Sequence, residues 1–420
     1  MKKINIHSID EVVYKETLPS GLNVYIYTSS LASVFDMNLI VHVGSRDNSF
    51  YVDDKIINIP DGVAHFLEHL TFNTKDGSVE DYYSNRGAYV NASTSFNSTI
   101  YNVKCNDSFY DNLIYLLDFV TNPFYTKELV EKERGIILEE ILTHMNNVDE
   151  QFYYKYCDNL FFNDTVKNPI GGIDVDVKNI TLDDIVNTYN CFYKKNNMDL
   201  VLTGDINPEE TISKLIEWDK SNLENSIIRK NKKDEPNEVK RKEYSYNDLV
   251  SNKKMMFGYK LLKESTGLND IELDVYSLLL SDIMFGESSD IKLLSETEGF
   301  IDGYIDNFFI NGDKHKVFSF EFESDDLDNA YNKIIDYIDN YEVKEDDLSR
   351  KIKVLISQLI LSFDDPQNYS SVLCNHLVKY GRVVDDFYDI LKDIDVNKIN
   401  RLLDLYRKSS KTYIKLLPKE

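Results

Sequence analysis

The sequence predicts an α+β protein of two similar domains, and three observations support this fold class. Its 420 residues exceed the length of one ordinary domain, and 42% of them are hydrophobic, which is enough for packed cores. A charged stretch that is poor in aromatic residues, 219–244, interrupts the regular patterns and is typical of an exposed linker. On either side of it, a strand, an acidic turn, an amphipathic helix and a long helix follow in the same order, which indicates an internal duplication. We therefore expect an N-terminal domain at 1–218, a linker at 219–244 and a C-terminal domain at 245–420.

Local patterning predicts the elements of the N-terminal domain in chain order. Apolar residues alternate with period two in the expected strands and recur every three or four residues in the expected helices. Helices should begin after Asp61, a capping residue before an apolar helical pattern, and after Asn207, which precedes Pro208. We expect strands at 12–18, 22–28, 37–43, 89–95, 98–105 and 200–205, and helices at 62–72, 109–120, 127–145 and from 208 onward.

The C-terminal region repeats part of this order. A strand-like segment precedes a helical one, and a further strand leads through an acidic turn into two helical patterns. These segments lie at 253–261, 271–285, 316–324, 327–338 and 347–361. Chance similarity of two strand–helix–helix units is the alternative to duplication.

The composition excludes several classes of partner. The formal net charge of −25 argues against binding to nucleic acid or anionic lipid. Such a surface attracts basic peptides, although a solvated acidic surface needs no partner at all. The four cysteines form no C-x-x-C pair, which fits a reducing cytoplasm. Because the first residues lack the apolar core of a secretory signal and no apolar run approaches the ~20 residues of a membrane helix, we expect a cytoplasmic protein without a transmembrane segment.

The pentapeptide His65-Phe66-Leu67-Glu68-His69 is the most informative motif. Residues four apart share one face of a helix, so both imidazoles can bind one cation while Glu68 lies beside them. Two neutral imidazoles, one carboxylate and an open position for water form a donor set that suits catalytic zinc. The order H-x-x-E-H is the inverse of the commoner H-E-x-x-H. An ordinary helix with two partly buried histidines is the alternative.

A third ligand should be an acidic residue on another helix. The helix after Pro123 contains five glutamates: Glu128, Glu131, Glu133, Glu139 and Glu140. Glu133 and Glu140 are two helical turns apart and share a face that is partly apolar, which is unusual for two carboxylates that bind nothing. Spacing alone does not distinguish Glu140 from Glu139 as the ligand.

The residues around this motif resemble the insulinase/pitrilysin family of zinc peptidases, which includes the mitochondrial processing peptidase. In that family H-x-x-E-H is followed by a later helix of the form E-R-x-x-x-x-x-E, matched here by the helix from Glu133 to Glu140. The resemblance implies Glu140 as the third ligand of one Zn²⁺ per chain and Glu133 as a carboxylate that supports the ligands. It covers 11–218 well and the second half only in layout. In detail the chain is similar to the bacterial single-clamshell branch, which includes peptidases of bacteriocin operons and a protein associated with elongation factor P modification.

The resemblance also implies the architecture and the reaction. Two αβ domains, each a sheet faced by helices, should form a clamshell half that encloses a chamber for a peptide substrate. Glu68 should act as the base that takes a proton from the attacking water. The segment Asn91-Ala92-Ser93 matches the edge strand on which the family binds its extended substrate.

One departure from the family concerns the second half. Active members carry an arginine and a tyrosine in a segment of the form L-R-E-x-x-G-x-x-Y, where Ser295 and Asp302 stand in this chain. We therefore expect a peptidase that needs a second, catalytically silent homologous chain to supply these groups. A self-sufficient homodimeric oligopeptidase, in which Tyr304, Lys314 or Lys316 substitutes, is one alternative. A non-proteolytic, modification-associated scaffold that keeps its zinc site is the other.

Overall fold

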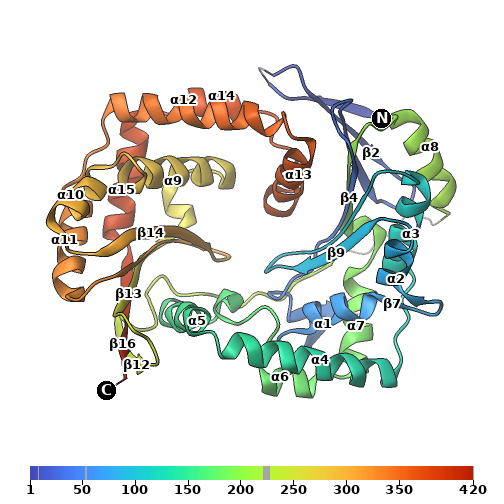
Figure 1. The fold of residues 1–420 in the computed structure, drawn as a ribbon, viewed down its shortest axis with the longest axis horizontal. Coiled ribbons are helices and arrows are strands. Elements are labelled where there is room, and N and C mark those ends of the chain that lie inside the picture. Colours follow the sequence, from blue (N-terminus) through green and yellow to red (C-terminus); the bar gives the residue numbers. More distant parts are fainter. Residues whose placement is uncertain (8, 53, 221–227, 420) are drawn as a thin grey trace. The chain divides into compact units, whose positions relative to one another are not determined.

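The computed structural model describes residues 1–419 apart from residues 8, 53 and 221–227, and the chain divides into two compact units (Figure 1). Unit 1 consists of Met1–Thr143, Pro169–Lys232 and Leu359–Phe387, and unit 2 consists of His144–Asn168, Lys233–Gln358 and Tyr388–Glu420. Each unit combines one main sheet with helices packed on it, which confirms the predicted α+β fold class.

Unit 1 is built on a seven-stranded sheet with the order β1-β2-β3-β11-β4-β10-β9. β11 runs parallel to β3, and the other neighbouring pairs are antiparallel. The strands are β1 (Lys2–Asn5), β2 (Val12–Thr17), β3 (Asn23–Thr28), β4 (Phe35–Val41), β9 (Tyr89–Thr94), β10 (Thr99–Cys105) and β11 (Met198–Gly204). The six predicted strands all form. β3, β4 and β11 are buried on both faces of the sheet, whereas β10 alternates between buried and half-buried residues. Two small hairpins, β5 (Ser49–Val52) with β6 (Lys55–Asn58) and β7 (Asn73–Thr74) with β8 (Gly77–Ser78), complete the unit.

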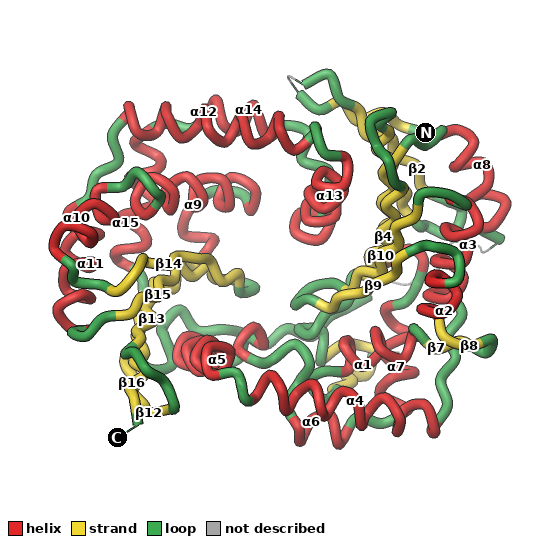
Figure 2. The backbone as a smooth tube through the Cα atoms, in the orientation of Figure 1, coloured by secondary structure: helices red, strands yellow, loops and turns green. Residues whose placement is uncertain are grey.

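The helices of unit 1 cover both faces of this sheet. They are α1 (Val63–Thr71), α2 (Val79–Ser84), α3 (Phe109–Thr121), α4 (Lys127–Met145), α6 (Asp174–Asn179), α7 (Leu182–Phe192), α8 (Pro208–Trp218) and α13 (Pro366–Tyr380). On one face Leu39 packs with Phe66 of α1 in the larger core. On the opposite face Tyr27 and Val201 pack with Leu373 of α13 in a second core. Figure 2 shows α1 and α13 on opposite sides of the sheet.

The predicted helix caps have different outcomes. Asn207 caps α8 as expected, since its side chain accepts hydrogen bonds from the backbone N–H groups of Glu209 and Glu210. The prediction that Asp61 caps α1 is wrong. The capping position belongs to Gly62, which makes no side-chain cap, and Asp61 Oδ1 instead accepts a 2.6 Å hydrogen bond from Asn48 Nδ2.

Unit 2 contains a five-stranded sheet with the order β12-β16-β13-β15-β14. Its strands are β12 (Glu243–Asp248), β13 (Lys254–Leu262), β14 (Asp302–Asn311), β15 (His315–Glu323) and β16 (Ser410–Pro418). Its helices are α5 (Val148–Leu160), α9 (Asp270–Phe285), α10 (Asp290–Glu298), α11 (Leu327–Asn340), α14 (Phe387–Lys392) and α15 (Val396–Lys408). α12 (Glu345–Ser362) begins in unit 2 and ends in the segment assigned to unit 1.

The two sheets share one topology, which supports the predicted duplication. The order β3-β11-β4-β10-β9 in unit 1 corresponds strand by strand to β12-β16-β13-β15-β14 in unit 2. In both, the pair at one end is parallel, β3 with β11 and β12 with β16, and the remaining pairs are antiparallel. Agreement in order and direction over five strands is not expected of two unrelated strand–helix–helix units.

The compact units do not follow the predicted domain boundaries, because each sequence half supplies one helix to the other unit. α5 follows α4 in the first half, yet Tyr156 of α5 donates a 3.0 Å hydrogen bond to Ser319 on β15 of unit 2. Gly258 makes room for this helix, since a Cβ there would lie 2.0 Å from the Tyr156 hydroxyl. In the second half, α13 follows α12 and buries Leu373 and Leu377 on the sheet of unit 1. The prediction of homologous domains at 1–218 and 245–420 therefore concerns their evolutionary origin. It does not describe the two compact units.

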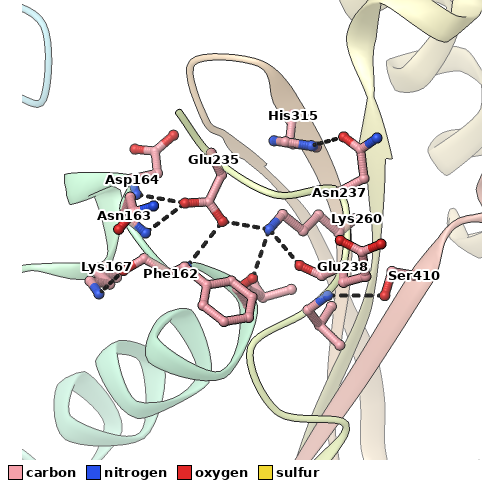
Figure 3. A network of polar contacts seen from close by, with 12 residues as sticks. Phe162, Asn163, Asp164, Lys167, Glu235, Asn237, Glu238, Lys260, His315 and Ser410 are labelled. Atoms are coloured by element: carbon pink, nitrogen blue, oxygen red, sulfur yellow. Dashed lines mark hydrogen bonds and ion pairs between the residues drawn. The ribbon is translucent and has the colours of Figure 1, made fainter. Parts of the chain in front are cut away.

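The segment predicted as a linker is partly buried where the structure describes it; residues 221–227 lie outside the described residues. Glu235 is 5% exposed and forms a 2.7 Å ion pair with buried Lys260 of β13 (Figure 3). Glu235 also accepts hydrogen bonds from the backbone N–H groups of Phe162, Asn163 and Asp164, just after α5. Glu235, within the predicted linker, thus attaches this segment to the end of α5 inside unit 2.

Candidate metal centre

α1 carries the H-x-x-E-H motif, with His65 and His69 beside α4 and Glu68 beside β9. Phe66, Leu67 and Leu70 are fully buried and hold α1 in the larger core. His65 and His69, one turn apart, are only partly exposed, and their ring centroids are 4.7 Å apart. The apolar face of the helix therefore fixes the direction in which both imidazoles project.

Two close backbone approaches position the start of α1. Gly62 has a φ of +91°, and a Cβ on it would lie 2.3 Å from the carbonyl oxygen of Gly171. Gly172 has a φ of +77°, and a Cβ there would lie 2.6 Å from the carbonyl oxygen of Asp61. A Cβ on Gly171 would lie 3.3 Å from His65 Nδ1. The segment after α5 thus packs against the first turn of α1 and against one imidazole, where no larger residue fits.

α4 brings Glu140 to the two imidazoles. Glu140 Oε1 lies 3.7 Å from His65 Nε2, and Glu140 Oε2 lies 3.4 Å from His69 Nε2. One ligand atom from each of these three residues falls within 4.8 Å of the others, and within the described part of the chain no other group of His, Cys, Asp or Glu does this. Glu139 is exposed on α4 and does not belong to this group.

Glu133 lies two helical turns before Glu140 on α4 and approaches the Nδ1 atom of His69. Its Oε2 is 3.7 Å from His69 Nδ1, and its Oε1 accepts a 3.4 Å hydrogen bond from Asn73 Nδ2. Asn73 also donates to the carbonyl oxygen of His69, so it links the end of α1 to the carboxylate. A buried carboxylate behind a ligand imidazole is the arrangement that orients the ring and fixes its tautomer in metal sites.

The charges of this cluster fit a bound divalent cation. Burial alone would lower the pKa of His69, but Glu133 and Glu140 raise it to about 9, so without a cation the cluster binds a proton. Burial raises the pKa of Glu133, yet the contacts with His69 and Lys132 hold it below its usual value. A site with two imidazoles and two nearby carboxylates needs positive charge, and a zinc ion supplies it with nitrogen and oxygen ligands of the preferred kind.

Arg134, the second residue of the E-R pair, fixes α4 rather than joining the site. Its guanidinium donates to the carbonyl oxygens of Val177 and Ile180, the latter at 2.8 Å, and pairs with Glu131. It also lies 5.6 Å from the ring centroid of Phe66 on α1. One arginine therefore ties α4 to α1 and to the segment after α6, which keeps the two ligand-bearing helices in register.

Glu68 is held by strand β9. The hydroxyl of Thr94 donates a short hydrogen bond to Glu68 Oε2. Burial raises the pKa of Glu68 above its ordinary value, and the Thr94 hydrogen bond and His69 counteract that rise. Sequence reasoning did not assign a role to Thr94, although the residue lies in the N-A-S-T-S segment. The alternation of side chains along β9 could have predicted its role, because it places Thr94 on the same face as Ala92, toward α1.

β9 is the edge strand of the sheet, and its residues divide into two sets. Ser95 N–H donates to Ser98 O at 2.8 Å, so this opposite pair is hydrogen-bonded, and bonded and non-bonded pairs then alternate along β9 and β10. By this alternation Asn91 and Ser93 exchange backbone hydrogen bonds with β10, whereas Ala92 turns its backbone N–H and C=O outward. Of the three predicted substrate-binding residues, Ala92 thus presents free main-chain groups, and Asn91 and Ser93 present side chains.

The residues expected to matter in unit 2 are less suited to catalysis. Ser295 is buried in α10 and donates to Lys292 O, while Asp302 is exposed at the start of β14. Lys316 is buried in an ion pair with Asp274, and Tyr304 is 69% exposed. The remaining histidines of this half behave as packing residues: buried His315 contacts Asn237, and His376 accepts from the backbone N–H of Val384.

A duplicated fold with one H-x-x-E-H helix is typical of two-domain metallopeptidase chains. Comparison with known families identifies which of these the chain belongs to. Residues 25–174 match the insulinase family model, peptidase family M16, and residues 179–355 match the model of the peptidase M16 inactive domain. The chain belongs to the insulinase family, which confirms the resemblance seen in the sequence. Membership supports peptidase activity, and hence a hydrolase, and it implies zinc as the metal.

Individual relatives agree with this placement. The uncharacterized zinc protease YmfH of Bacillus subtilis is 32% identical over 74% of this chain and 72% of its own length. The human mitochondrial-processing peptidase subunit beta is 30% identical over 46% of this chain and 39% of its own length. The fold matches the crystal structure of an M16-like peptidase from Alicyclobacillus acidocaldarius, with a TM-score of 0.91 at 23% identity over 99% of this chain and all of the other. No helix among the described residues is long and apolar enough to cross a membrane.

Proposed function

We propose that this chain is a zinc-dependent endopeptidase that uses His65, His69 and Glu140 as ligands and Glu68 as the general base. The observation that carries the proposal is the convergence of three ligand atoms within 4.8 Å, with the buried Glu68 carboxylate on the same helix. Glu133 is the group that supports His69. One zinc ion per chain follows from one such group among the described residues.

The residues divide the work of peptide hydrolysis. A zinc ion held here would polarise the scissile carbonyl and lower the pKa of a bound water. Glu68 accepts the proton from the attacking water and later returns it to the leaving amine. The Thr94 hydroxyl keeps the Glu68 carboxylate in one orientation. The outward N–H and C=O of Ala92 pair with an extended peptide and place its scissile bond beside the base.

The substrate is a peptide or a leader segment of a precursor, bound in the enclosed chamber that the family fold implies. The net charge of −25 favours net positive peptides through long-range attraction. The unpaired cysteines support a reducing cytoplasm as the location: Cys105, Cys157, Cys191 and Cys374 form no disulfide within the described chain.

A homologous, catalytically silent partner chain completes the site in this proposal. Ser295 and Asp302 provide neither a cation nor a phenol for the developing oxyanion, and losing such a donor costs ~3 kcal/mol, a factor of about a hundred or more in rate. Lys314 and Lys316, the lysines that could substitute, are paired with Asp234 and Asp274. Tyr304 remains as the candidate within the chain because it is exposed.

Kinetics with and without a candidate partner test the proposal. Glu68→Gln should keep zinc and the fold but lose hydrolysis, and it should retain bound peptide substrate. The wild-type chain alone should turn over slowly and gain about a hundredfold with a homologue that lacks H-x-x-E-H but carries the arginine. Full turnover by the isolated chain, with a large loss in Tyr304→Phe, would favour the homodimeric oligopeptidase. Zinc binding without hydrolysis under any condition would favour the scaffold.

A further inference from the structure

A groove of uncharged residues runs beside the edge strand β9 within unit 1. It has a volume of about 340 Å³ and is lined by residues of β9 and α13; α13 lies on the face of the sheet opposite α1. β9 contributes Asn91, Ala92 and Ser93, and α13 contributes Ser371 and Asn375. The latter two belong to one helical stripe, since 371, 374, 375 and 378 all line the groove at spacings of three and four. We call this feature the β9–α13 groove.

The side chains of β9 alternate between the groove and the metal centre. Ala92 packs against the larger core, and Thr94 donates to Glu68, so these even-numbered residues face α1. Asn91 and Ser93 line the groove on the other face. A peptide that pairs with β9 continues this alternation, because successive side chains in a strand point to opposite faces of the sheet. Every second side chain of such a peptide is directed to the groove.

The groove is lined by neutral residues, and amides and hydroxyls supply its polar groups. No lining residue is charged, and Ile100, Cys374 and Val378 add short apolar surface. The side-chain amides of Asn91 and Asn375 make no hydrogen bond within the described part of the chain, so they are open to a ligand on both donor and acceptor sides. The lining can satisfy an amide or hydroxyl of a substrate but offers no counter-charge to an ammonium or carboxylate.

Buried carboxylate Asp36 does not change this chemistry. It is 3% exposed and accepts hydrogen bonds from Asn38 at 3.0 Å and from Asn102 at 2.6 Å, both of which line the groove. Lys104 lies 3.8 Å from its other oxygen. These contacts use the carboxylate inside the sheet and hold the two amides of the groove floor in fixed orientations.

We propose that the β9–α13 groove is a specificity site that receives alternate side chains of the extended peptide and prefers neutral hydrogen-bonding ones, such as Asn, Gln, Ser and Thr, over charged ones. The proposal rests on the proposed peptidase function and deepens it. If basic peptides are attracted by the net charge, their positively charged residues should therefore lie at the positions that do not face the groove.

A positional scan of one cleaved peptide tests the groove. Gln, Lys and Glu are placed in turn at each residue around the cleaved bond, and kcat/KM is measured for each. At every second position, Gln should be preferred by roughly tenfold over both Lys and Glu. At the intervening positions, little preference is expected. A scan without this period of two, or one in which a charged residue is preferred at every position, would overturn the proposal.

A charge introduced into the groove supplies the matched test. Asn375→Asp should move the preference at groove-facing positions toward Lys by about fivefold, as expected for one partly exposed ion pair. Asn368→Asp puts the same charge on the same helix, outside the groove and seven residues away, which is ~10 Å along the axis, and should shift the preference less than about twofold. Equal shifts in the two variants would refute the assignment of Asn375 to the site.

Binding separates a failure of the groove from a failure of the peptidase proposal. The same labelled peptides are titrated against Glu68→Gln and against Glu68→Gln with Asn375→Asp, and anisotropy reports affinity. If wild-type protein cleaves nothing but the alternate preference persists in binding, the peptidase function fails and the groove stands. If peptides bind without any such preference, or do not bind at all, the groove proposal fails.

Discussion

The hydrogen bond from Thr94 to Glu68 provides the sharpest test of how the site is organised. Thr94→Val removes the donor and leaves a side chain of nearly the same shape. Glu68 then keeps its buried position but loses the hydroxyl that holds its carboxylate on the side of β9. Because the Thr94 hydroxyl bonds to Glu68 and Thr99 and, among the described residues, to none of the three proposed metal ligands, zinc content and thermal stability should change little.

The magnitude follows from the kind of bond that is lost. A hydrogen bond to a charged group contributes about 1.5–3 kcal/mol. If the bond matters chiefly for orienting the base in the transition state, kcat should fall roughly 10- to 150-fold while KM stays near its wild-type value. Thr94→Ser restores the hydroxyl and should recover most of the activity, which a purely structural role for the methyl group would not allow.

The assay is steady-state hydrolysis of a fluorogenic peptide by the chain alone or with the proposed partner, whichever is more active. Zinc content and the melting temperature of each variant are measured in parallel. Wild-type kcat in Thr94→Val would show that Glu68 needs no positioning from β9. Equal losses in Thr94→Val and Thr94→Ser would show that packing, and not the hydroxyl, is responsible.

Three further predictions concern the metal ligands and one buried carboxylate. Glu140→Gln should lose zinc on dialysis while Glu139→Gln, the adjacent exposed control, retains it; metal analysis with the reverse result would move the ligand by one residue. Glu133→Gln should weaken zinc affinity by roughly 10- to 100-fold without abolishing it, and unchanged affinity in a chelator competition would remove its supporting role. Burial raises the pKa of Glu321 to about 7, so its neutral form stabilises the fold at low pH and this contribution is lost as the pH rises through 7. Glu321→Gln should therefore raise the melting temperature more at pH 8 than at pH 5, and an equal gain at both would contradict this reading of Glu321.

The exchange of α5 and α13 between the units has a consequence for the site. α13 forms one wall of the β9–α13 groove, although it lies more than 270 residues after β9 in the chain. The second half, which lacks a metal motif, therefore contributes to the surface of unit 1 beside β9. A homologue that kept only 1–218 would retain the ligand helices and lose that wall.

The sequence by itself determined the local chemistry of this protein. Helical spacing places His65 and His69 on one face wherever the helix lies, and an H-x-x-E-H order adds a carboxylate beside them. Six of the seven strands in the main sheet of unit 1 and the start of α8 at Asn207 also followed from local patterns, because apolar runs and capping depend on neighbours in the chain; β1 and the two small hairpins were not predicted. The duplication was visible for the same reason, since related segments keep related patterns.

Only the tertiary structure decided which surfaces meet. Adjacent Glu139 and Glu140 are equivalent by spacing, and the packing of α4 beside α1 turns Glu140 alone toward the imidazoles. The apolar stripe of α13 predicts that the helix is buried. It does not predict that the helix covers β4 and β11, which belong to the other half of the sequence. The bond from Thr94 to Glu68 joins residues on different elements. Periodicity fixes which side chains share a face of one helix or strand, whereas the partner of that face depends on packing summed over residues far apart in the chain.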